Sequence, residues 1–251
     1  MGRAPTQKPN MGLAPRSSYL LVVAFAALFS LIMFFSFLWQ NVQAGKPLKL
    51  RLYTHNIRYD NKNLTPGERP WELRRPLVSE SIENNTSGGP SVVCLQEVLF
   101  NQLEDILADL NTNNNWEYFG VGRKDGIKTG EYAPILYKTA DWALESSRTY
   151  WLSETPDKPS VGWDAALERI VTEVVLKSKR NGQRVKVLNT HFDHKGVKAR
   201  RESVKLIIRK MQVGHEPSFL CGDFNTQPTD EPYSILKGTE YMDSRTSREL
   251  G

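Results

Sequence analysis

The sequence predicts an α+β domain built on mixed β-sheets, and three observations support this class. Strand-like apolar segments outnumber amphipathic helical segments, and the two kinds alternate along the chain. An Asn-Gly pair at 181–182 separates the strand-like segments 170–176 and 184–188, which is typical of a β-hairpin. Because a hairpin makes antiparallel neighbours, the sheets are predicted to be mixed rather than doubly wound and parallel.

Length and composition are those of one globular domain with an extension. The chain has 251 residues, of which 24% are charged and 39% hydrophobic. Of the net charge of +5, the first 44 residues supply three charges through Arg3, Lys8 and Arg16, with no acidic residue. The remaining 30 basic and 28 acidic residues nearly cancel. Charge alone therefore gives no argument for nucleic-acid binding.

The N-terminal extension predicts a membrane anchor. Residues 19–39 are an apolar stretch of 21 residues interrupted only by two serines. As a helix it spans roughly 30 Å, the thickness of a bilayer core. We therefore expect a disordered polar tail at 1–18, a transmembrane signal anchor at 19–39, a linker at 40–47 and a folded domain at 48–251. The alternative is a secreted protein whose signal peptide is cleaved near Ala44.

The side of the membrane is only weakly indicated. Three basic residues precede the apolar stretch and three follow closely, so the positive-inside rule gives a near tie. The short N-terminal tail and the Asn-x-Thr sequons at Asn63 and Asn84 favour a domain outside the cytosol, in the secretory pathway. The sequence indicates no protein partner.

The N-terminal half of the domain predicts two strands and two helices. Apolar and polar residues alternate from residue 48 to residue 53, as in a half-buried strand. Segment 91–96 is a short apolar strand, and segments 71–83 and 101–110 have helical spacing. The apolar residues assigned to the first helix are Leu73, Leu77 and Ile82.

The C-terminal half adds a long amphipathic helix at 197–213 and an apolar strand at 218–221. The exposed residues of this helix are strongly basic, which we interpret as a solvated face rather than a nucleic-acid surface. Cys94 and Cys221 both fall in predicted core strands. We interpret them as small buried residues, not as a disulfide framework or a metal site.

The segment 222–225, Gly-Asp-Phe-Asn, follows the last of these strands. Side chains alternate along an extended chain, so Asp223 and Asn225 are expected to point the same way. The carboxylate can orient or deprotonate a water, and the amide can donate a hydrogen bond to a phosphoryl oxygen. The alternative is a strand that simply ends in a turn.

Three other predicted strands also end in polar side chains. Asn56, Glu97 and His191 each stand at or just after the C-terminal end of a strand. Four such ends that converge would form a site. Glu97 is a suitable ligand for Mg²⁺, which prefers hard oxygen donors. Asn56 can support that ion or hold a phosphate oxygen, and local turn capping is its alternative role.

The order Asn56, Glu97, His191, Asp223-x-Asn225 resembles the endonuclease/exonuclease/phosphatase superfamily, which has the DNase I-like fold. The resemblance covers roughly residues 48–241 and implies a four-layer α-β-β-α sandwich. Segments typical of one branch of that family occur at 122–126, 130–135, 151–156 and 162–166.

The resemblance also implies roles for individual residues. Glu97 and Asn56 would lie at a Mg²⁺ ion, for which Mn²⁺ is an alternative, and His191 would contact the scissile phosphate. An imidazole with an ordinary pKa near about 6.5 can donate to an oxyanion. Arg123 and Tyr132 belong to a glycine-rich segment expected at the rim, where they would bind substrate. A packed Tyr132 in a surface loop is the alternative.

One part of the family pattern is missing from the sequence. The family ordinarily continues with two more strands, the last of which carries a Ser-Asp-His signature. This chain stops at Gly251, 26 residues after Asn225, without that signature. We therefore expect a domain that is incomplete at its C-terminus and hydrolyses its substrate weakly or not at all.

Two functional hypotheses follow. The first is a membrane-anchored, Mg²⁺-dependent phosphoric-ester hydrolase, of the phosphodiesterase, nuclease or phosphatase type. Its substrate would be a nucleic acid, a nucleotide or a phospholipid headgroup. The alternative is a catalytically inactive, membrane-anchored domain that binds a phosphorylated ligand or protein.

Overall fold

The computed structural model describes residues 22, 25–26, 28–36, 47–112 and 115–244. The chain divides into two compact units, Met1–Lys46 and Pro47–Gly251. In the first unit the described residues are helical and exposed. Among the described residues, no helix has both the length and the apolar character needed to cross a membrane. The predicted tail at 1–18, parts of the predicted anchor at 19–39 and nearly all of the linker lie outside the described residues.

The second unit contains two four-stranded sheets, with strand orders β1-β2-β4-β3 and β5-β6-β7-β8. In each sheet one pair is parallel, β1 with β2 and β7 with β8, and the other pairs are antiparallel. The prediction of mixed sheets is therefore confirmed. The strands are β1 (Arg51–Asn56), β2 (Ser91–Gln96), β3 (Trp116–Phe119), β4 (Ile135–Lys138), β5 (Trp142–Trp151), β6 (Ile170–Ser178), β7 (Arg184–His191) and β8 (Ser218–Asp223).

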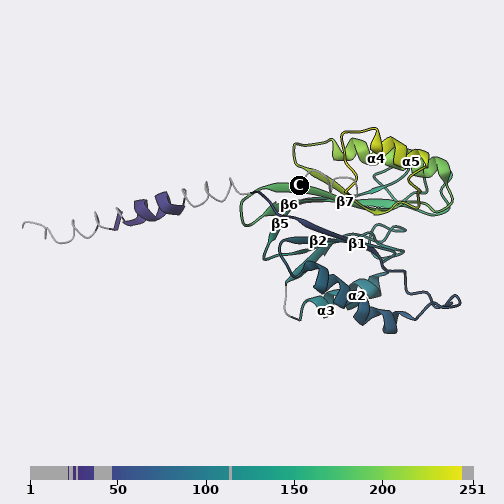
Figure 1. Ribbon diagram of the computed structural model, residues 1–251, viewed down its shortest axis with the longest axis horizontal. Coiled ribbons are helices and arrows are strands. Elements are labelled where there is room, and N and C mark those ends of the chain that lie inside the picture. Colours follow the sequence, from purple (N-terminus) through teal and green to yellow (C-terminus); the bar gives the residue numbers. More distant parts are fainter. Residues whose placement is uncertain (1–21, 23–24, 27, 37–46, 113–114, 245–251) are drawn as a thin grey trace, which may run out of the picture. The chain divides into compact units, whose positions relative to one another are not determined.

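Helices cover the outer face of each sheet (Figure 1). Helices α2 and α3 pack on the first sheet, and α4 and α5 pack on the second. The second unit thus has the α-β-β-α layer order that the family resemblance implied. The bounds are α2 (Trp71–Thr86), α3 (Phe100–Leu110), α4 (Val197–Met211) and α5 (Glu231–Lys237).

Three hydrophobic clusters fill the three spaces between the layers. Leu95 of β2 belongs to the cluster under α2 and α3, whereas its neighbour Cys94 belongs to the cluster between the sheets. Consecutive residues reach different clusters because side chains alternate across a strand. Every residue of β2 is therefore buried, which explains why its sequence is continuously apolar up to Gln96.

The buried face of α2 differs from the predicted one. Leu73 and Leu77 are 59% and 57% exposed, although the sequence pattern assigned them to the apolar face. Ile82 is buried as predicted, and it shares the buried face with Trp71 and Val78, at spacings of four and seven residues. The prediction was therefore right for Ile82 and wrong for Leu73 and Leu77.

Two buried amides join the sheets. Asn189 of β7 donates from Nδ2 to the carbonyl oxygens of Leu95 (2.7 Å) and Pro134 (2.9 Å), both in the first sheet or at its edge. Gln96 of β2 donates from Nε2 to Asn189 Oδ1 at 2.8 Å. Both amide side chains are fully buried. These bonds fix the two sheets against each other near the ends of β2 and β7.

Candidate active site

The ends of four strands meet at one edge of the sandwich. Asn56 ends β1, His191 ends β7 and Asp223 ends β8, while Glu97 immediately follows β2. Because β1 and β2 are parallel, and β7 and β8 are parallel, the register places their last residues level with one another. Each sheet thus contributes two polar ends, as the sequence pattern predicted.

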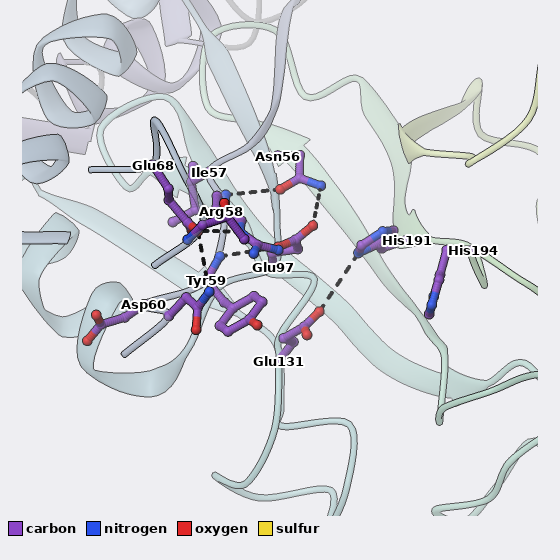
Figure 2. A network of polar contacts seen from close by, with 12 residues as sticks. Asn56, Ile57, Arg58, Tyr59, Asp60, Glu68, Glu97, Glu131, His191 and His194 are labelled. Atoms are coloured by element: carbon purple, nitrogen blue, oxygen red, sulfur yellow. Dashed lines mark hydrogen bonds and ion pairs between the residues drawn. The ribbon is translucent and has the colours of Figure 1, made fainter. Parts of the chain in front are cut away.

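Asn56 connects the two sheets at this edge. Figure 2 shows its contacts with Glu97 and Arg58. Its Nδ2 donates to Glu97 Oε1 and to Asp223 Oδ2, each at 2.9 Å. Its Oδ1 accepts from the backbone N–H of Arg58 at 3.0 Å, which fixes the orientation of the amide. The two carboxylates therefore share one donor nitrogen, which holds them side by side.

The loop after β1 also supports Glu97. The backbone N–H of Tyr59 donates to Glu97 Oε2 at 3.3 Å, and Arg58 Nη1 lies 3.5 Å from the same oxygen. Arg58 is itself turned toward Glu68, whose Oε1 accepts from its Nε at 2.9 Å. Arg74 anchors this loop from α2 by donating to the carbonyl oxygens of three successive loop residues.

Asn225 and His191 form the second half of the site. Asn225 Nδ2 donates to the carbonyl oxygen of Phe192 at 2.9 Å and lies 3.0 Å from His191 Nε2. Because that amide nitrogen is a donor, Nε2 accepts, and the neutral imidazole carries its proton on Nδ1. The backbone N–H of Asn225 donates to Asp223 Oδ1 at 3.0 Å. The Asp-x-Asn motif thus positions its own carboxylate and the histidine together.

His191 is neutral at physiological pH. Burial, reinforced by the positive charge of Arg169, lowers the pKa of His191 to about 4. An ordinary pKa was expected from the sequence, and the difference arises because the ring lies behind the site rather than in solvent. Its Nδ1 faces Glu131 Oε2 at 3.9 Å (Figure 2).

A small cationic cavity lies behind His191. It is lined by Arg123, Glu131, Arg169 and His191, among others. Arg123 Nη2 donates to Glu131 Oε1 at 2.8 Å. Within the described part of the chain, Arg123 Nε, Arg169 Nη1 and His191 Nδ1 are buried donors that have no hydrogen-bond partner. Burial lowers the pKa of Arg123 and raises the pKa of Glu131, so this cavity is a region of low dielectric.

Arg123 and Tyr132 were expected at the rim of the site, but both side chains are buried. Arg123 is buried and lines the small cavity behind His191. Tyr132 is 3% exposed, and its hydroxyl donates to the carbonyl oxygen of Ile127 at 2.9 Å. Burial raises the pKa of Tyr132 to about 12. The structure brings Arg123 into contact with the site and places Tyr132 in the core, with its ring against Phe100.

An open groove of about 580 Å³ leads to the site. It runs between β1 and β8 and is lined by Thr54, Asn56, Gln96 and residues 222–227. Gly222 makes this arrangement possible, because a Cβ at this position would stand 2.2 Å from the carbonyl oxygen of Thr190, and its φ is +151°. The glycine of the Gly-Asp-Phe-Asn segment therefore lets β8 pass close to β7 and sets Asp223 beside His191.

Sequence reasoning missed Glu131 and Arg169 as neighbours of the site. Glu131 lies in one of the segments that carry the family resemblance, which was the available signal. Arg169 has no comparable signal in the sequence. It lies immediately before β6 and forms a buried ion pair with Asp193, with Nε 3.3 Å from Oδ2.

The segment after His191 is structural. Asp193 is 2% exposed and accepts hydrogen bonds from the backbone N–H groups of Lys195 and Gly196. Although burial acts in the opposite direction, these bonds and Arg169 hold the pKa of Asp193 well below its usual range. Asp164, within the segment 162–166, accepts from the backbone N–H groups of Lys198 and Ala199 at the start of α4.

Comparison with known proteins identifies relatives for most of the chain. The family described as Endonuclease/Exonuclease/phosphatase matches residues 41–249. An endonuclease/exonuclease/phosphatase from Bacteroides vulgatus is 39% identical, with a TM-score of 0.70, over 76% of this chain and 72% of that chain. A mannosyl-6-phosphatase from Bacteroides thetaiotaomicron is 34% identical, with a TM-score of 0.70, over 76% of this chain and 71% of that chain.

A curated relative is more distant. An uncharacterized protein of Acanthamoeba polyphaga mimivirus is 29% identical over 163 residues, which is 62% of this chain. The match covers 59% of the length of that viral protein.

Proposed function

This chain belongs to the endonuclease/exonuclease/phosphatase family, and on that premise we propose that it is a metal-dependent hydrolase of phosphoric esters. The observation that supports this most directly is the Asn56 amide, which joins the Glu97 and Asp223 carboxylates from two different sheets. Two ionised oxygens held side by side, next to a neutral imidazole and a second amide, suit the binding and attack of a phosphate.

The donor set fits Mg²⁺. Within the described ranges, no set of three or more His, Cys, Asp or Glu side chains is placed to hold a metal ion. Mg²⁺ does not require such a set, because it keeps several of its waters and binds through one or two carboxylates. Glu97 would hold the ion, with Asn56 at its side. The bound ion would neutralise charge on the phosphate, and Mn²⁺ has similar ligand preferences.

The side chains around Glu97 have separate tasks. Asp223 accepts hydrogen bonds and is therefore suited to orient and deprotonate an attacking water. Asn56 and Asn225 donate to protein acceptors, so their task is to hold Glu97, Asp223 and His191 in place around the proposed phosphate position. His191, whose Nε2 already accepts from Asn225, keeps that amide in position and excludes water from behind.

The substrate is proposed to be a small phosphoric ester rather than a long nucleic acid. Residues 45–251 contain 30 basic and 28 acidic residues, which is too balanced for strong attraction to a polyanion. The Bacteroides relative named as a mannosyl-6-phosphatase supports a sugar phosphate as the first compound to test. Nucleotides and phospholipid headgroups are the next candidates, because they present the same phosphate to an open groove.

The test is a phosphate-release assay on the full chain in mild detergent. Mannose 6-phosphate, a nucleoside monophosphate, a phosphoinositide headgroup and a single-stranded oligonucleotide are each tested with Mg²⁺, with Mn²⁺ and with a chelator. Glu97→Gln and Asp223→Asn are expected to lower the rate on the order of 100-fold or more. Glu104→Gln, an exposed glutamate of α3, is the matched control and should leave the rate unchanged.

Two results would contradict the proposal. One is a rate that is the same with metal and with chelator. The other is that Glu97→Gln and Asp223→Asn each hydrolyse the substrate at the same rate as the control Glu104→Gln. Tight metal-dependent binding of a phosphate ester without turnover in the unsubstituted chain would instead favour the inactive binding domain.

We further propose that residues 19–39 anchor the protein to a membrane, with the domain outside the cytosol. The 21-residue apolar stretch supports this, as do the exposed apolar side chains of residues 28–35. Asn63 is exposed in the loop before α2, so it is accessible for glycosylation. In secretory cells the chain should stay in the alkali-washed membrane fraction and lose mass on deglycosylation, and Asn63→Gln should reduce that loss. A mature N-terminus just after Ala44 would show cleavage instead.

A further inference from the structure

The two cysteines of the chain face each other across the space between the sheets. Cys94 lies in β2 of the first sheet and Cys221 lies in β8 of the second. Both thiols are free and buried, and both belong to the hydrophobic cluster between the sheets. From sequence they were expected to be small buried residues and not a disulfide framework or a metal site, and the burial is confirmed.

The hydrogen bond between Gln96 and Asn189 aligns the two strands that carry the cysteines. On β2, Cys94 is two residues before Gln96, so both side chains point toward the second sheet. On the second sheet, Cys221 pairs with Asn189 across the β7–β8 ladder. Since Gln96 donates to Asn189 at 2.8 Å, the partner positions Cys94 and Cys221 are also brought together. Both side chains lie in the one hydrophobic cluster between the sheets, close enough for each thiol to shift the pKa of the other.

The two thiols are not equivalent. Cys94 is fully buried, whereas Cys221 is 8% exposed and lies in β8, which has a strand neighbour on only one side among the described residues. Burial raises the pKa of the Cys94 thiol, while the hydrogen bond from Cys94 lowers the pKa of Cys221. Cys221 is therefore the sulfur that an oxidant reaches first and that more readily becomes a thiolate.

We propose that Cys94 and Cys221 form an intramolecular disulfide that ties the two sheets together when the folded chain meets a small disulfide oxidant. With glutathione disulfide, the Cys221 thiolate attacks one sulfur, forms a mixed disulfide and releases one glutathione thiolate, which takes up the proton that Cys221 lost. The Cys94 thiolate then attacks the Cys221 sulfur and releases the second glutathione in the same way. Two protein thiols are oxidised and one glutathione disulfide is reduced to two thiols.

The bond would lie directly behind the site. Cys94 is three residues before Glu97, and Cys221 is two residues before Asp223. A covalent link there would hold together the two strands that supply these carboxylates. It would also close the long stretch of chain from residue 94 to residue 221, and long closed loops restrict the unfolded chain most.

The experiment uses the full chain in mild detergent, incubated with glutathione disulfide and then treated with N-ethylmaleimide in denaturant. The expected intact mass is that of the chain less two hydrogen atoms, with no maleimide or glutathione attached. Peptide mapping should find the peptides containing Cys94 and Cys221 joined in a monomer. The melting temperature should rise by roughly 5–15 °C and return when dithiothreitol is added.

Single variants identify the order of reaction. Cys94→Ala should retain one glutathione on Cys221, because no second thiol is present to displace it. Cys221→Ala should remain unmodified, because Cys94 is fully buried. If the oxidised chain instead carries two maleimides, a lasting glutathione adduct or a bond between two chains, the proposal is wrong. The measurement on the unsubstituted chain decides this even if neither variant folds.

Discussion

Glu97 and Asn225 occupy backbone conformations that few residues adopt. Their φ angles are +59° and +44°, in the left-handed region, where a side chain with a Cβ is strained. Asn tolerates this region better than Glu does. Strain of this kind persists where the surroundings impose it, and here the Asn56 and Tyr59 hydrogen bonds hold the Glu97 carboxylate in place.

The strain at Glu97 predicts an unusual order of stabilities. Glu97→Gly should be more stable than Glu97→Ala by about 1 kcal/mol, because glycine adopts a positive φ without a steric penalty. Both variants should be inactive, since both remove the carboxylate. Urea unfolding of the two variants measures the difference. The same pair of substitutions at Glu104, an exposed position inside α3, should show the opposite order, with alanine more stable.

His191 predicts a loss of stability in mild acid. Its folded pKa of about 4 lies below the ordinary 6.5, so the unfolded chain takes up the proton first as pH falls. The stability associated with a neutral His191 is complete above about pH 6.5. It falls as the pH is lowered toward 4, by up to about 3 kcal/mol.

Chemical unfolding between pH 4 and pH 7.5 tests this. His191→Gln should lose less stability than the unsubstituted chain over that interval. His215→Gln, at an exposed histidine, is the matched control and should follow the unsubstituted chain. Equal slopes for His191→Gln and the unsubstituted chain would contradict a buried neutral imidazole.

At the scale of elements, the first turn of α4 is capped by a side chain from outside the helix. Its N-cap, Gly196, offers no side-chain cap, and Asp164 from a distant loop accepts from the backbone N–H groups of Lys198 and Ala199 instead. Asp193 occupies the turn just before the helix, where its two amide bonds and Arg169 fix the chain after His191. Asp164 and Asp193 thus fix the segment between the end of β7 and the start of α4.

Removing the Asp164 carboxylate should weaken this start. Asp164→Ala is expected to lower the melting temperature by roughly 2–4 °C, because two amide donors lose their acceptor. Asp157→Ala removes an exposed aspartate that is paired with exposed Arg148, and it should leave the melting temperature nearly unchanged. Circular dichroism during heating compares the two. A similar shift for both would show that Asp164 does not cap α4.

Some elements were predictable and others were not. The limits of β2 were predicted to the residue, because all six of its positions are buried and a run of four apolar residues lies between its terminal Ser91 and Gln96. β5 was not predicted, since its central residues are exposed and polar and give no alternating pattern. The short strands β3 and β4 are stabilised by their neighbours across the sheet, and the local sequence does not contain that information.

For the whole molecule, the contact between the sheets depends on Asn189 and Gln96. Asn189→Ala would leave the carbonyl oxygens of Leu95 and Pro134, and one amide donor of Gln96, without that partner in the core. We expect a destabilisation of about 3 kcal/mol or more, because each buried unsatisfied group costs about 1–3 kcal/mol. Activity should fall as well, since the ends of β2 and β7 would no longer be aligned.

Urea unfolding and the phosphate-release assay measure the two effects. Asn85→Ala, at an exposed amide of α2, is the control and should change stability by no more than about 0.5 kcal/mol. A destabilisation of Asn189→Ala that is no larger than the control's would mean that apolar packing alone holds the sheets.

Local sequence patterns were enough to predict the strand ends and the polar residues that stand at them. Side-chain alternation is a property of the extended backbone, so it applies as far as Asp223, where β8 ends, and not to Asn225, whose φ is +44°. Tertiary structure decided which groups meet. Asn56 contacts Asp223 across 167 residues of chain, burial and Arg169 lower the pKa of His191, and Tyr132 is buried. These outcomes depend on how two sheets pack face to face, and contacts between distant segments leave no periodic pattern in a single sequence.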